Sequence, residues 1–446
     1  MTSAHPDKNQ QRRSDFVNWF RDSSPYIHAH RQRTFVISFG GEAVKDRCFA
    51  NLVHDFALLN SLGIQLVLVH GIRPQIDERL ISQQRQSQFV DNLRITDDLT
   101  LQYVKEAAGS VRVEIEALLS MGLANSPMAG AKIRVVSGNF ISAKPIGVID
   151  GIDFEHTGKV RRVDQHQIKQ QLQLNNVVLI SPVGYSPSGE AFNLCAEDVA
   201  TEVAIALNAE KLILMTEQAI TAVGSDTLIA QMTCSEADSY LQQNPTLGLT
   251  IEKPLSAAIK ACETGVNRAH LINRHTDGGL LLELFSRDGS GTLISANSYE
   301  ELRPATLNDI TGILELLAPL EKQEKLIQRS RAHLEIEIDD YLIIERDGLI
   351  IGCIALHCFA DSNSGEIACL AVHPDYRRHA RGQQLLAQAT NLAQKKGLQN
   401  LFVLSTQTLH WFIERGFDPV DKSTLPEPLI SNYNLLRSSK VFRKTI

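Results

Sequence analysis

The sequence predicts an α/β protein with two domains, and two observations lead to this fold class. Short apolar segments alternate with helix-like segments from residue 34 to about residue 296, which is typical of a mainly parallel sheet covered by helices on both faces. The pattern starts again near residue 297, where a new strand precedes a new amphipathic helix. We therefore expect a tail and helix over residues 1–33, a three-layer α/β/α domain over 34–296, and a mixed α/β domain over 297–446.

The first domain is expected to begin with a buried strand at residues 34–39 that ends at Gly40-Gly41. Apolar residues at helical spacing follow over residues 49–59. Further apolar runs predict strands at residues 66–70, 177–180 and 212–215. In sheets of this kind, ligands bind beyond the carboxyl ends of the strands, where Gly40-Gly41 and His70-Gly71 lie.

An amphipathic helix is expected before this sheet. Phe16, Trp19, Phe20 and Ile27 form its apolar side. These side chains suit contact with a second copy of the chain, and they suit packing within one molecule equally well.

The second domain is expected to begin with a strand at residues 302–306 and a helix that Thr306 or Asn308 caps. A hairpin with an Asp-Gly turn is expected over 341–352. Glu366 then begins a strand that ends at His373-Pro374. A short basic turn follows, and Gly382 opens an amphipathic helix.

This basic turn has the chemistry of a pyrophosphate site. Backbone N–H groups at a helix N-terminus attract anions, and Arg377, Arg378 and Arg381 flank them. Together with the hairpin and an (aromatic)-x-x-x-Gly-Phe sequence at 411–417, the turn resembles that of the GCN5-related N-acetyltransferases (GNAT), with Ala380 in place of the first loop glycine. The resemblance implies that acetyl-CoA is bound by Leu370, Val372, Arg377, Arg378, His379, Ala380, Arg381 and Gly382.

Acetyl transfer to an amine requires a base, a donor to the oxyanion and an acid for the leaving thiolate. Glu366 is the expected base, acting through a water, and the backbone N–H groups near Leu370 to Val372 are the expected oxyanion donors. Ser405 is the expected acid because Phe412 stands where many relatives carry a tyrosine. The alternatives are that Glu366 is a solvent-exposed carboxylate and that Ser405 is an ordinary strand-end serine.

The first domain resembles the amino acid kinase family, and acetylglutamate kinase in particular, at residues 36–41, 67–71, 93–97, 136–139, 180–184 and 193–197. Two positions depart from the kinase pattern: Ser38 replaces a lysine, and Glu197 replaces an aspartate. Phosphoryl transfer needs cations over the developing charge, which serine does not supply. We therefore expect a domain that senses a metabolite and does not transfer phosphate.

The far end of this domain resembles the arginine-binding segment of arginine-sensitive acetylglutamate kinases. A guanidinium pairs with a carboxylate, which Glu283 supplies. Gly289 and Gly291 allow backbone carbonyls to approach the ligand, and the N-terminal helix closes the site with Tyr26. The alternative is that Glu283 faces solvent on an amphipathic element.

The two domains in this order resemble the bacterial N-acetylglutamate synthase family. The resemblance implies transfer of acetyl from acetyl-CoA to the α-amine of L-glutamate, the first step of arginine biosynthesis, with inhibition by L-arginine. It also implies a homo-oligomeric ring, often a hexamer. The expected glutamate-binding residues are Arg329, Arg437 and Ser439.

Composition excludes several other classes of function. The net charge of −7 and a pI near 6.1 argue against a nucleic-acid or anionic-membrane binder. Seven cysteines without a Cys-x-x-Cys pair indicate a reducing, cytoplasmic setting with no metal site. No secretory signal or membrane-spanning run is expected.

Two alternatives stay open: a phosphotransferase with an accessory domain, and a non-enzymatic amino-acid sensor that binds a partner protein.

Overall fold

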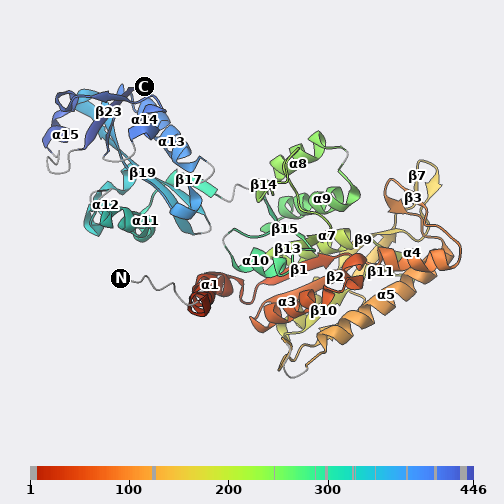
Figure 1. The fold of residues 1–446 in the computed structure, drawn as a ribbon. Coiled ribbons are helices and arrows are strands. Elements are labelled where there is room, and N and C mark those ends of the chain that lie inside the picture. Colours follow the sequence, from red (N-terminus) through yellow and green to blue (C-terminus); the bar gives the residue numbers. More distant parts are fainter. Residues whose placement is uncertain are drawn as a thin grey trace. The chain divides into compact units, whose positions relative to one another are not determined.

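The computed structural model describes residues 8–122, 127–245, 247–286, 288–296, 300–323, 326, 328–346, 348–377, 380–405, 409–431 and 439–446. The chain divides into two units, Met1–Asn297 and Ser298–Ile446 (Figure 1). The division lies one residue after the end predicted for the first domain.

Unit 1 is built around an eight-stranded sheet in the order β14-β16-β15-β13-β1-β2-β10-β5. All neighbouring strands are parallel except β15 and β16, which are antiparallel. The predicted mainly parallel sheet is thus confirmed. Its strands are β1 (Thr34–Phe39), β2 (Gln65–His70), β5 (Val135–Val136), β10 (Val177–Ile180), β13 (Lys211–Thr216), β14 (Gln231–Thr233), β15 (Arg268–Asn273) and β16 (Thr292–Ser295).

Helices cover both faces of this sheet because its strands are apolar on both sides. Along β1, Val36 packs into one core, whereas Phe35 and Ile37 pack into the other, as the two-residue alternation of a strand requires. Figure 1 shows α7 and α9 on one face and α3 and α5 on the other. The helices are α1 (Lys8–His30), α2 (Gly41–Lys45), α3 (Phe49–Ser61), α4 (Arg73–Ser82), α5 (Asp98–Leu119), α6 (Gln165–Gln173), α7 (Ala196–Leu207), α8 (Cys234–Gln243), α9 (Leu249–Glu263) and α10 (Gly279–Phe285).

Smaller sheets border the carboxyl edge of the large one. A four-stranded sheet has the order β12-β11-β6-β9, and two short hairpins are formed by β3 with β4 and by β7 with β8. No sequence pattern predicted these strands, since most are only two or three residues long. They are β3 (Phe89–Val90), β4 (Leu93–Arg94), β6 (Ile141–Pro145), β7 (Val148–Ile149), β8 (Ile152–Asp153), β9 (Gly158–Val163), β11 (Val183–Tyr185) and β12 (Ala191–Asn193).

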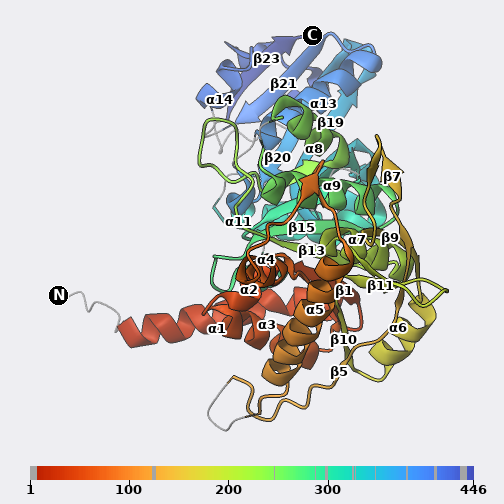
Figure 2. The ribbon, with the colours of Figure 1, turned by 90° about the vertical axis from the view of Figure 1, so that its right-hand side faces the viewer.

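Helix α1 projects from unit 1 (Figure 2). It carries exposed aromatic side chains. Phe16, Trp19 and Phe20 are 64%, 42% and 56% exposed. Packing within unit 1 therefore does not account for them. The C-terminal part of α1 does pack, because Ser23 and His30 are buried against α10.

Unit 2 contains a seven-stranded sheet in the order β17-β18-β19-β20-β21-β23-β22, in which only β20 and β21 are parallel neighbours. Helices α11 and α12 pack on one face, and α13 and α14 on the other. The expected mixed α/β fold is confirmed. Its elements are β17 (Glu300–Pro304), α11 (Ile310–Lys322), α12 (Arg331–Glu337), β18 (Tyr341–Arg346), β19 (Leu349–Phe359), β20 (Ser364–Val372), α13 (Arg381–Lys395), β21 (Asn400–Ser405), α14 (Leu409–Ile413), β22 (Asp418–Val420), α15 (Glu427–Ser431) and β23 (Lys440–Thr445). Over the described part of the chain, none of the helices has the length and apolar character needed to cross a bilayer.

Candidate functional site

A cavity of about 550 Å³ lies in unit 2 where β20 and β21 part. The two strands pair from Ser364–Asn400 to Ile367–Val403, and beyond that point the strand ends border the cavity. Backbone groups on these facing edges are therefore not used to pair the strands with each other. Six of the residues predicted from the sequence line this cavity: Leu370, Val372, Arg377, Ala380, Gly382 and Ser405.

The first turn of α13 closes one side of the cavity and depends on a strained residue. Ala380 precedes the helix at φ 55° and ψ 21°, in the left-handed region. A non-glycine residue there costs about 1–2 kcal/mol, so the alanine accepts the conformation that glycine adopts freely. The turn nevertheless places the N-terminal backbone of α13 beside Arg377, which is exposed. Arg378 and His379 lie outside the described residues.

The Arg381 side chain is engaged within the protein, where the sequence predicted a contact with phosphate. Its guanidinium is buried, donates to Glu300 through Nε at 2.7 Å and through Nη2 at 2.5 Å, and donates to the Tyr376 carbonyl through Nη1 at 2.9 Å. Arg346 pairs with the same Glu300 carboxylate at 3.3 Å. A guanidinium engaged in this way holds the turn in place, so we correct its predicted role from phosphate binding to support of the turn.

Glu300→Gln is expected to raise the KM for acetyl-CoA by about tenfold, because hydrogen bonds to charged groups contribute about 1.5–3 kcal/mol. Arg381→Gln should give an increase of similar size, as the two side chains act as a pair. Glu301→Gln, at an exposed neighbouring position, serves as the control. Steady-state kinetics with varied acetyl-CoA measure the effect. If Arg381→Gln alone raised the KM, Arg381 would contact the phosphates directly.

Glu366 lies near the start of β20, opposite His357 on β19 and Phe402 on β21. Its side chain is half-buried one residue before the strands begin to part. Burial raises the pKa of the Glu366 carboxyl, whereas the nearby His357 and Arg329 act in the opposite direction. A carboxyl group with a raised pKa is suited to accept a proton near neutral pH.

The opposite wall of the cavity comes from β21 and α14. Ser405 ends β21, and Phe412 is buried beside it in the wall. Ser405 pairs with Lys440 in register, so the buried Ser439 lies next to this strand end. Arg437 lies outside the described residues.

Arg415 also lines the cavity and was missed from the sequence. Its guanidinium lies 4.0 Å from the centre of the Trp411 ring and donates to the Trp411 carbonyl at 2.8 Å. Its Nε is buried with no hydrogen-bond partner among the described residues. The only sequence signal was the i, i+4 spacing of Trp411 and Arg415, and this spacing is weak evidence for a binding site.

Arg329 lies near the catalytic candidate Glu366, whose pKa it lowers. Its Nη1 is 3.0 Å from His333 Nε2 and 3.7 Å from Glu337 Oε2. Its Nε is buried with no hydrogen-bond partner in the described part of the chain. Arg331, by contrast, is 64% exposed and pairs with Glu335 within α12. The neighbouring arginines therefore occupy different environments, and Arg329 fits a substrate-binding role better.

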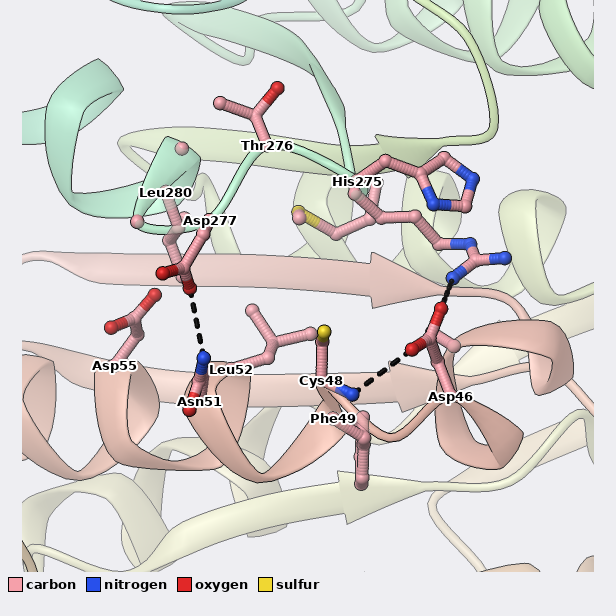
Figure 3. Close-up of a pocket in the computed structure, with 15 residues that line it drawn as sticks. Asp46, Cys48, Phe49, Asn51, Leu52, Asp55, His275, Thr276, Asp277 and Leu280 are labelled. Atoms are coloured by element: carbon pink, nitrogen blue, oxygen red, sulfur yellow. Dashed lines mark hydrogen bonds and ion pairs between the residues drawn. The ribbon is translucent and has the colours of Figure 1, made fainter.

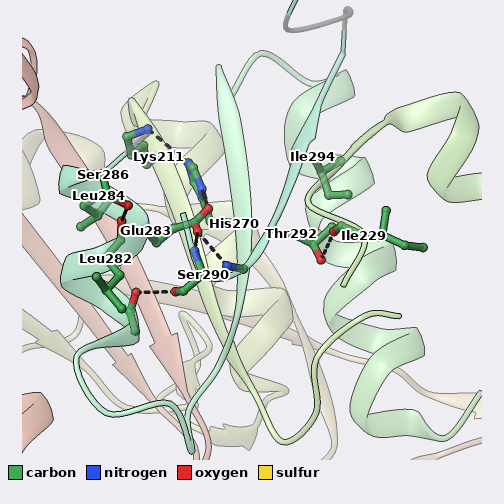
Figure 4. Close-up of polar contacts among 12 residues, drawn as sticks. Lys211, Ile229, His270, Leu282, Glu283, Leu284, Ser286, Ser290, Thr292 and Ile294 are labelled. Carbon is green, nitrogen blue, oxygen red and sulfur yellow. Dashed lines mark hydrogen bonds and ion pairs between the residues drawn. The ribbon is translucent and has the colours of Figure 1, made fainter. Parts of the chain in front are cut away.

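In unit 1, the predicted effector residue Glu283 is buried and does not face solvent (Figure 4). One carboxylate oxygen lies 2.6 Å from His270 Nδ1. The other accepts from the backbone N–H groups of Ser290 at 2.7 Å and Gly291 at 2.8 Å. The loop thus presents N–H groups to Glu283, where carbonyls directed at a ligand had been expected.

The two predicted glycines of this loop are required by close packing. A Cβ at Gly289, where φ is +64°, would lie 2.4 Å from the Glu283 carboxylate, and one at Gly291 would lie 2.4 Å from the Leu271 carbonyl. Either addition would displace the loop from Glu283.

Lys211 extends the polar contacts of Glu283 and His270, and the sequence analysis did not identify it. Its Nζ lies 3.1 Å from His270 Nε2, so the ammonium donates to Nε2 while Nδ1–H donates to Glu283. Burial lowers the pKa of His270 to about 4, with a further contribution from the Lys211 charge. Burial alone would raise the pKa of Glu283, but its hydrogen bonds from His270, Ser290 and Gly291 outweigh burial and lower it to about 2. At neutral pH a neutral imidazole therefore separates an ammonium from a carboxylate.

Helix α1 docks beside this cluster. Ser23 Oγ donates to the Phe285 carbonyl at 3.1 Å, and His30 Nε2 lies 2.9 Å from the Leu284 carbonyl. Both carbonyls belong to α10, the helix that carries Glu283. Tyr26 is half-buried on the same part of α1, with its ring 6.3 Å from that of His30.

The carboxyl edge of the large sheet holds a cleft of about 170 Å³ that includes Gly40, Gly41, Gly71 and Glu197. Ser38 is buried below it. Three cationic side chains line the cleft: Arg73, Arg94, which pairs with Asp77 at 2.8 Å, and Lys253, which lies 3.6 Å from Asp198. The kinase-like cleft thus retains positive charge although Ser38 has none.

A smaller cavity of about 90 Å³ lies between α3 and the turn at residues 274–280 (Figure 3). Asn51 donates to Asp277 at 3.0 Å, and Asp46 binds Arg274 at 2.8 Å. Burial and the Asp277 charge raise the pKa of Asp55 to about 7. None of the site residues predicted from the sequence lines it.

Over the described residues, no group of three or more His, Cys, Asp or Glu side chains is arranged to hold a metal ion.

Comparison with known families matches both units. The amino acid kinase family matches residues 33–273, and the acetyltransferase (GNAT) domain matches residues 337–419. The two matches occur in the order that the sequence predicted.

Relatives match this chain over nearly its whole length. An amino-acid acetyltransferase of Azotobacter vinelandii is 52% identical over 97% of this chain and 100% of its own length. The crystal structure of N-acetylglutamate synthase from Neisseria gonorrhoeae complexed with coenzyme A and L-arginine is 37% identical, with a TM-score of 0.88 over 97% of this chain and 99% of that one. The same enzyme complexed with coenzyme A and N-acetyl-glutamate is 38% identical, with a TM-score of 0.62 over 96% and 99% of the two chains. This chain therefore belongs to the amino-acid acetyltransferase family, with an amino acid kinase domain followed by a GNAT domain.

Proposed function

We propose that this enzyme transfers acetyl from acetyl-CoA to the α-amino group of L-glutamate, giving N-acetyl-L-glutamate and CoA as the first step of arginine biosynthesis. The observation that carries the proposal is the cavity between the parted ends of β20 and β21, bordered by the N-terminus of α13 and adjacent to Glu366. The Neisseria gonorrhoeae enzyme, named N-acetylglutamate synthase, supports glutamate as the acceptor.

The residues of unit 2 suit each step of this reaction. Glu366 accepts a proton from the ammonium through a water, and the freed amine attacks the thioester carbonyl. Backbone N–H groups near Leu370 to Val372 stabilise the oxyanion. Ser405, at the opposite wall, protonates the departing thiolate. Arg329, Arg437 and Ser439 bind the two carboxylates of glutamate, and the N-terminal turn of α13 with Arg377 and its neighbours binds the pyrophosphate.

We further propose that L-arginine inhibits the enzyme by binding at Glu283 in unit 1. Arginine carries a cationic guanidinium at one end and a carboxylate at the other, which complements the Glu283 carboxylate and the Lys211 ammonium on either side of His270. Tyr26 and the packing of α1 on α10 link the site to the N-terminal helix. The complex of the Neisseria gonorrhoeae enzyme with L-arginine supports this ligand.

The exposed aromatic side chains of α1 suit contact between copies of the chain in a homo-oligomeric ring. Phe16, Trp19 and Phe20 together present the apolar surface for that contact. Size-exclusion chromatography with light scattering measures the number of copies.

Release of the CoA thiol from acetyl-CoA is the direct test of the reaction. Across a panel of twenty amino acids, we expect thiol release with L-glutamate and a loss of that activity when L-arginine is added. A stronger response to another amino acid would contradict the proposed acceptor. Formation of ADP from ATP and N-acetylglutamate would instead favour the phosphotransferase, and a failure to bind acetyl-CoA in calorimetry would favour the non-enzymatic sensor.

A further inference from the structure

Strand β20 contains a bulge at the point where it reaches the cavity. Cys353 pairs with Ala371 and Ala355 pairs with Ala368, so Cys369 and Leu370 together lie opposite one residue of β19. Cys369 has a φ of 51°. Among the described residues it is the one non-glycine residue within a strand that adopts a positive φ. Bulges of this kind usually carry glycine at that position.

A cysteine at this position is disfavoured relative to an ordinary backbone conformation. Such strain persists where the surrounding contacts fix it, and it is frequent at functional sites. Cys369 fits that description because it lines the acetyl-transfer cavity between Ala368 and Leu370.

The surrounding contacts converge on the Cys369 sulfur. Tyr341, which is fully buried on β18, donates its hydroxyl to Sγ at 3.3 Å. The guanidinium of Arg329 interacts with the same sulfur. The Cys353 thiol donates to the Cys369 carbonyl at 3.3 Å and so holds the backbone of the bulge from the other side.

We propose that Cys369 is a positioning residue for acetyl transfer, whose sulfur fixes both the bulge of β20 and the guanidinium of Arg329. The inference rests on the proposed function, in which Arg329 binds the amino-acid substrate. Arg329 lies near Sγ, and its Nη1 is 3.7 Å from Glu337 Oε2. Its buried Nε has no hydrogen-bond partner among the described residues and suits a substrate carboxylate. The bulge in turn directs the Leu370 backbone at the cavity.

This role differs from that of a nucleophile. An acetyl-cysteine intermediate would need the Cys369 thiolate to attack the thioester carbon and expel the CoA thiolate, with the thiol proton lost beforehand. Burial raises the pKa of the Cys369 thiol, although its contacts with Arg329 and Tyr341 act in the opposite direction. The sulfur also accepts the Tyr341 hydroxyl, so it serves as a fixed acceptor in the wall of the cavity.

The test compares Cys369→Ala, Cys369→Ser and Tyr341→Phe with the wild type in steady-state kinetics. Cys369→Ala is expected to raise the KM for glutamate by about tenfold, which corresponds to the loss of about 1.4 kcal/mol. Cys369→Ser keeps an acceptor for Tyr341 and should recover most of the affinity. Tyr341→Phe should act like Cys369→Ala, and the double variant should be no worse than either single one because the two groups act together.

Cys369→Gly separates strain from contact. Glycine adopts a positive φ without strain. The thermal midpoint of Cys369→Gly should therefore exceed that of Cys369→Ala, while both variants keep the raised KM for glutamate. Cys358→Ala, at an exposed cysteine of the same unit, is the control. A wild-type glutamate KM in Cys369→Ala, or acetyl-Cys369 detected by mass spectrometry after mixing with acetyl-CoA, would overturn the inference. A wild-type enzyme without glutamate-dependent thiol release would instead overturn the proposed function.

Discussion

Glu366→Gln is expected to lower kcat by about 10²–10⁴-fold, the usual contribution of a general base. Glutamine has nearly the same shape as glutamate but cannot accept the proton that the ammonium must lose before it attacks the thioester. Glu366 is paired in register with His357 and Phe402 on the neighbouring strands, and an amide of equal size fits the same position. We therefore expect a loss of chemistry with a preserved fold.

The pH dependence of the reaction tests whether Glu366 is the group that accepts the proton. Since burial raises the pKa of Glu366, protonation of this carboxyl begins at a higher pH than for an exposed glutamate. The kcat/KM of the wild type should consequently fall as the pH decreases through this raised pKa, because only the carboxylate is a base. Glu366→Gln should lack that limb and retain only the dependence that comes from the substrate amine.

Calorimetric titration with acetyl-CoA and a thiol-release assay together check this result. Acetyl-CoA should bind Glu366→Gln with wild-type affinity because the cavity and the α13 turn are untouched. Glu335→Gln is the matched control, since Glu335 lies in the same unit but pairs with Arg331 at the surface. Wild-type turnover in Glu366→Gln would remove Glu366 from the mechanism.

The fold could be predicted from local patterns because its main strands are short apolar runs that stop at glycine or proline. The strands at 34–39 and 66–70 are examples, and both were found within one residue of the expected bounds. The short strands around β3, β7 and β11 could not be predicted in this way. Two or three residues carry no measurable periodicity, and pairing with distant strands decides their conformation.

The candidate site was predictable where backbone and sequence neighbours define it, as at Leu370, Gly382 and Ser405 around the cavity. Side-chain direction was not predictable where a distant partner decides it. Arg381 is engaged within the protein because Glu300, 81 residues earlier, neutralises it in a buried position. Likewise, nothing local relates Lys211 to His270, which are 59 residues apart and meet only because β13 and β15 are neighbours.

Glu283→Gln is expected to weaken inhibition by L-arginine by about 10–100-fold while the uninhibited rate stays at the wild-type level. A hydrogen bond to a charged group contributes about 1.5–3 kcal/mol, and its loss falls on the guanidinium of arginine. Glutamine can still accept from the Ser290 and Gly291 N–H groups, so the loop at residues 289–291 keeps its anchor. The change therefore removes one charge and the hydrogen bond from His270 Nδ1–H, while the loop stays anchored.

The inhibition constant for arginine at several pH values and the thermal midpoint with and without arginine are the measurements. With a pKa of about 2 for Glu283 and about 4 for His270, neither group changes charge between about pH 6 and 9. The wild-type inhibition constant should thus be insensitive to these groups in that range. Below it, protonation of His270 adds a positive charge beside Lys211 and should weaken inhibition.

Thermal stabilisation by arginine distinguishes a loss of arginine binding from a loss of coupling between the arginine site and the active site. A ligand that binds only the folded state raises the midpoint according to its affinity, so Glu283→Gln should lose most of this shift together with inhibition. Glu263→Gln, at an exposed position of the same unit, should retain both. If Glu283→Gln kept the full shift but lost inhibition, Glu283 would transmit the signal from a site elsewhere. If it kept both, arginine would bind at another place in the chain, because coupling between two sites requires that the effector contact one of them.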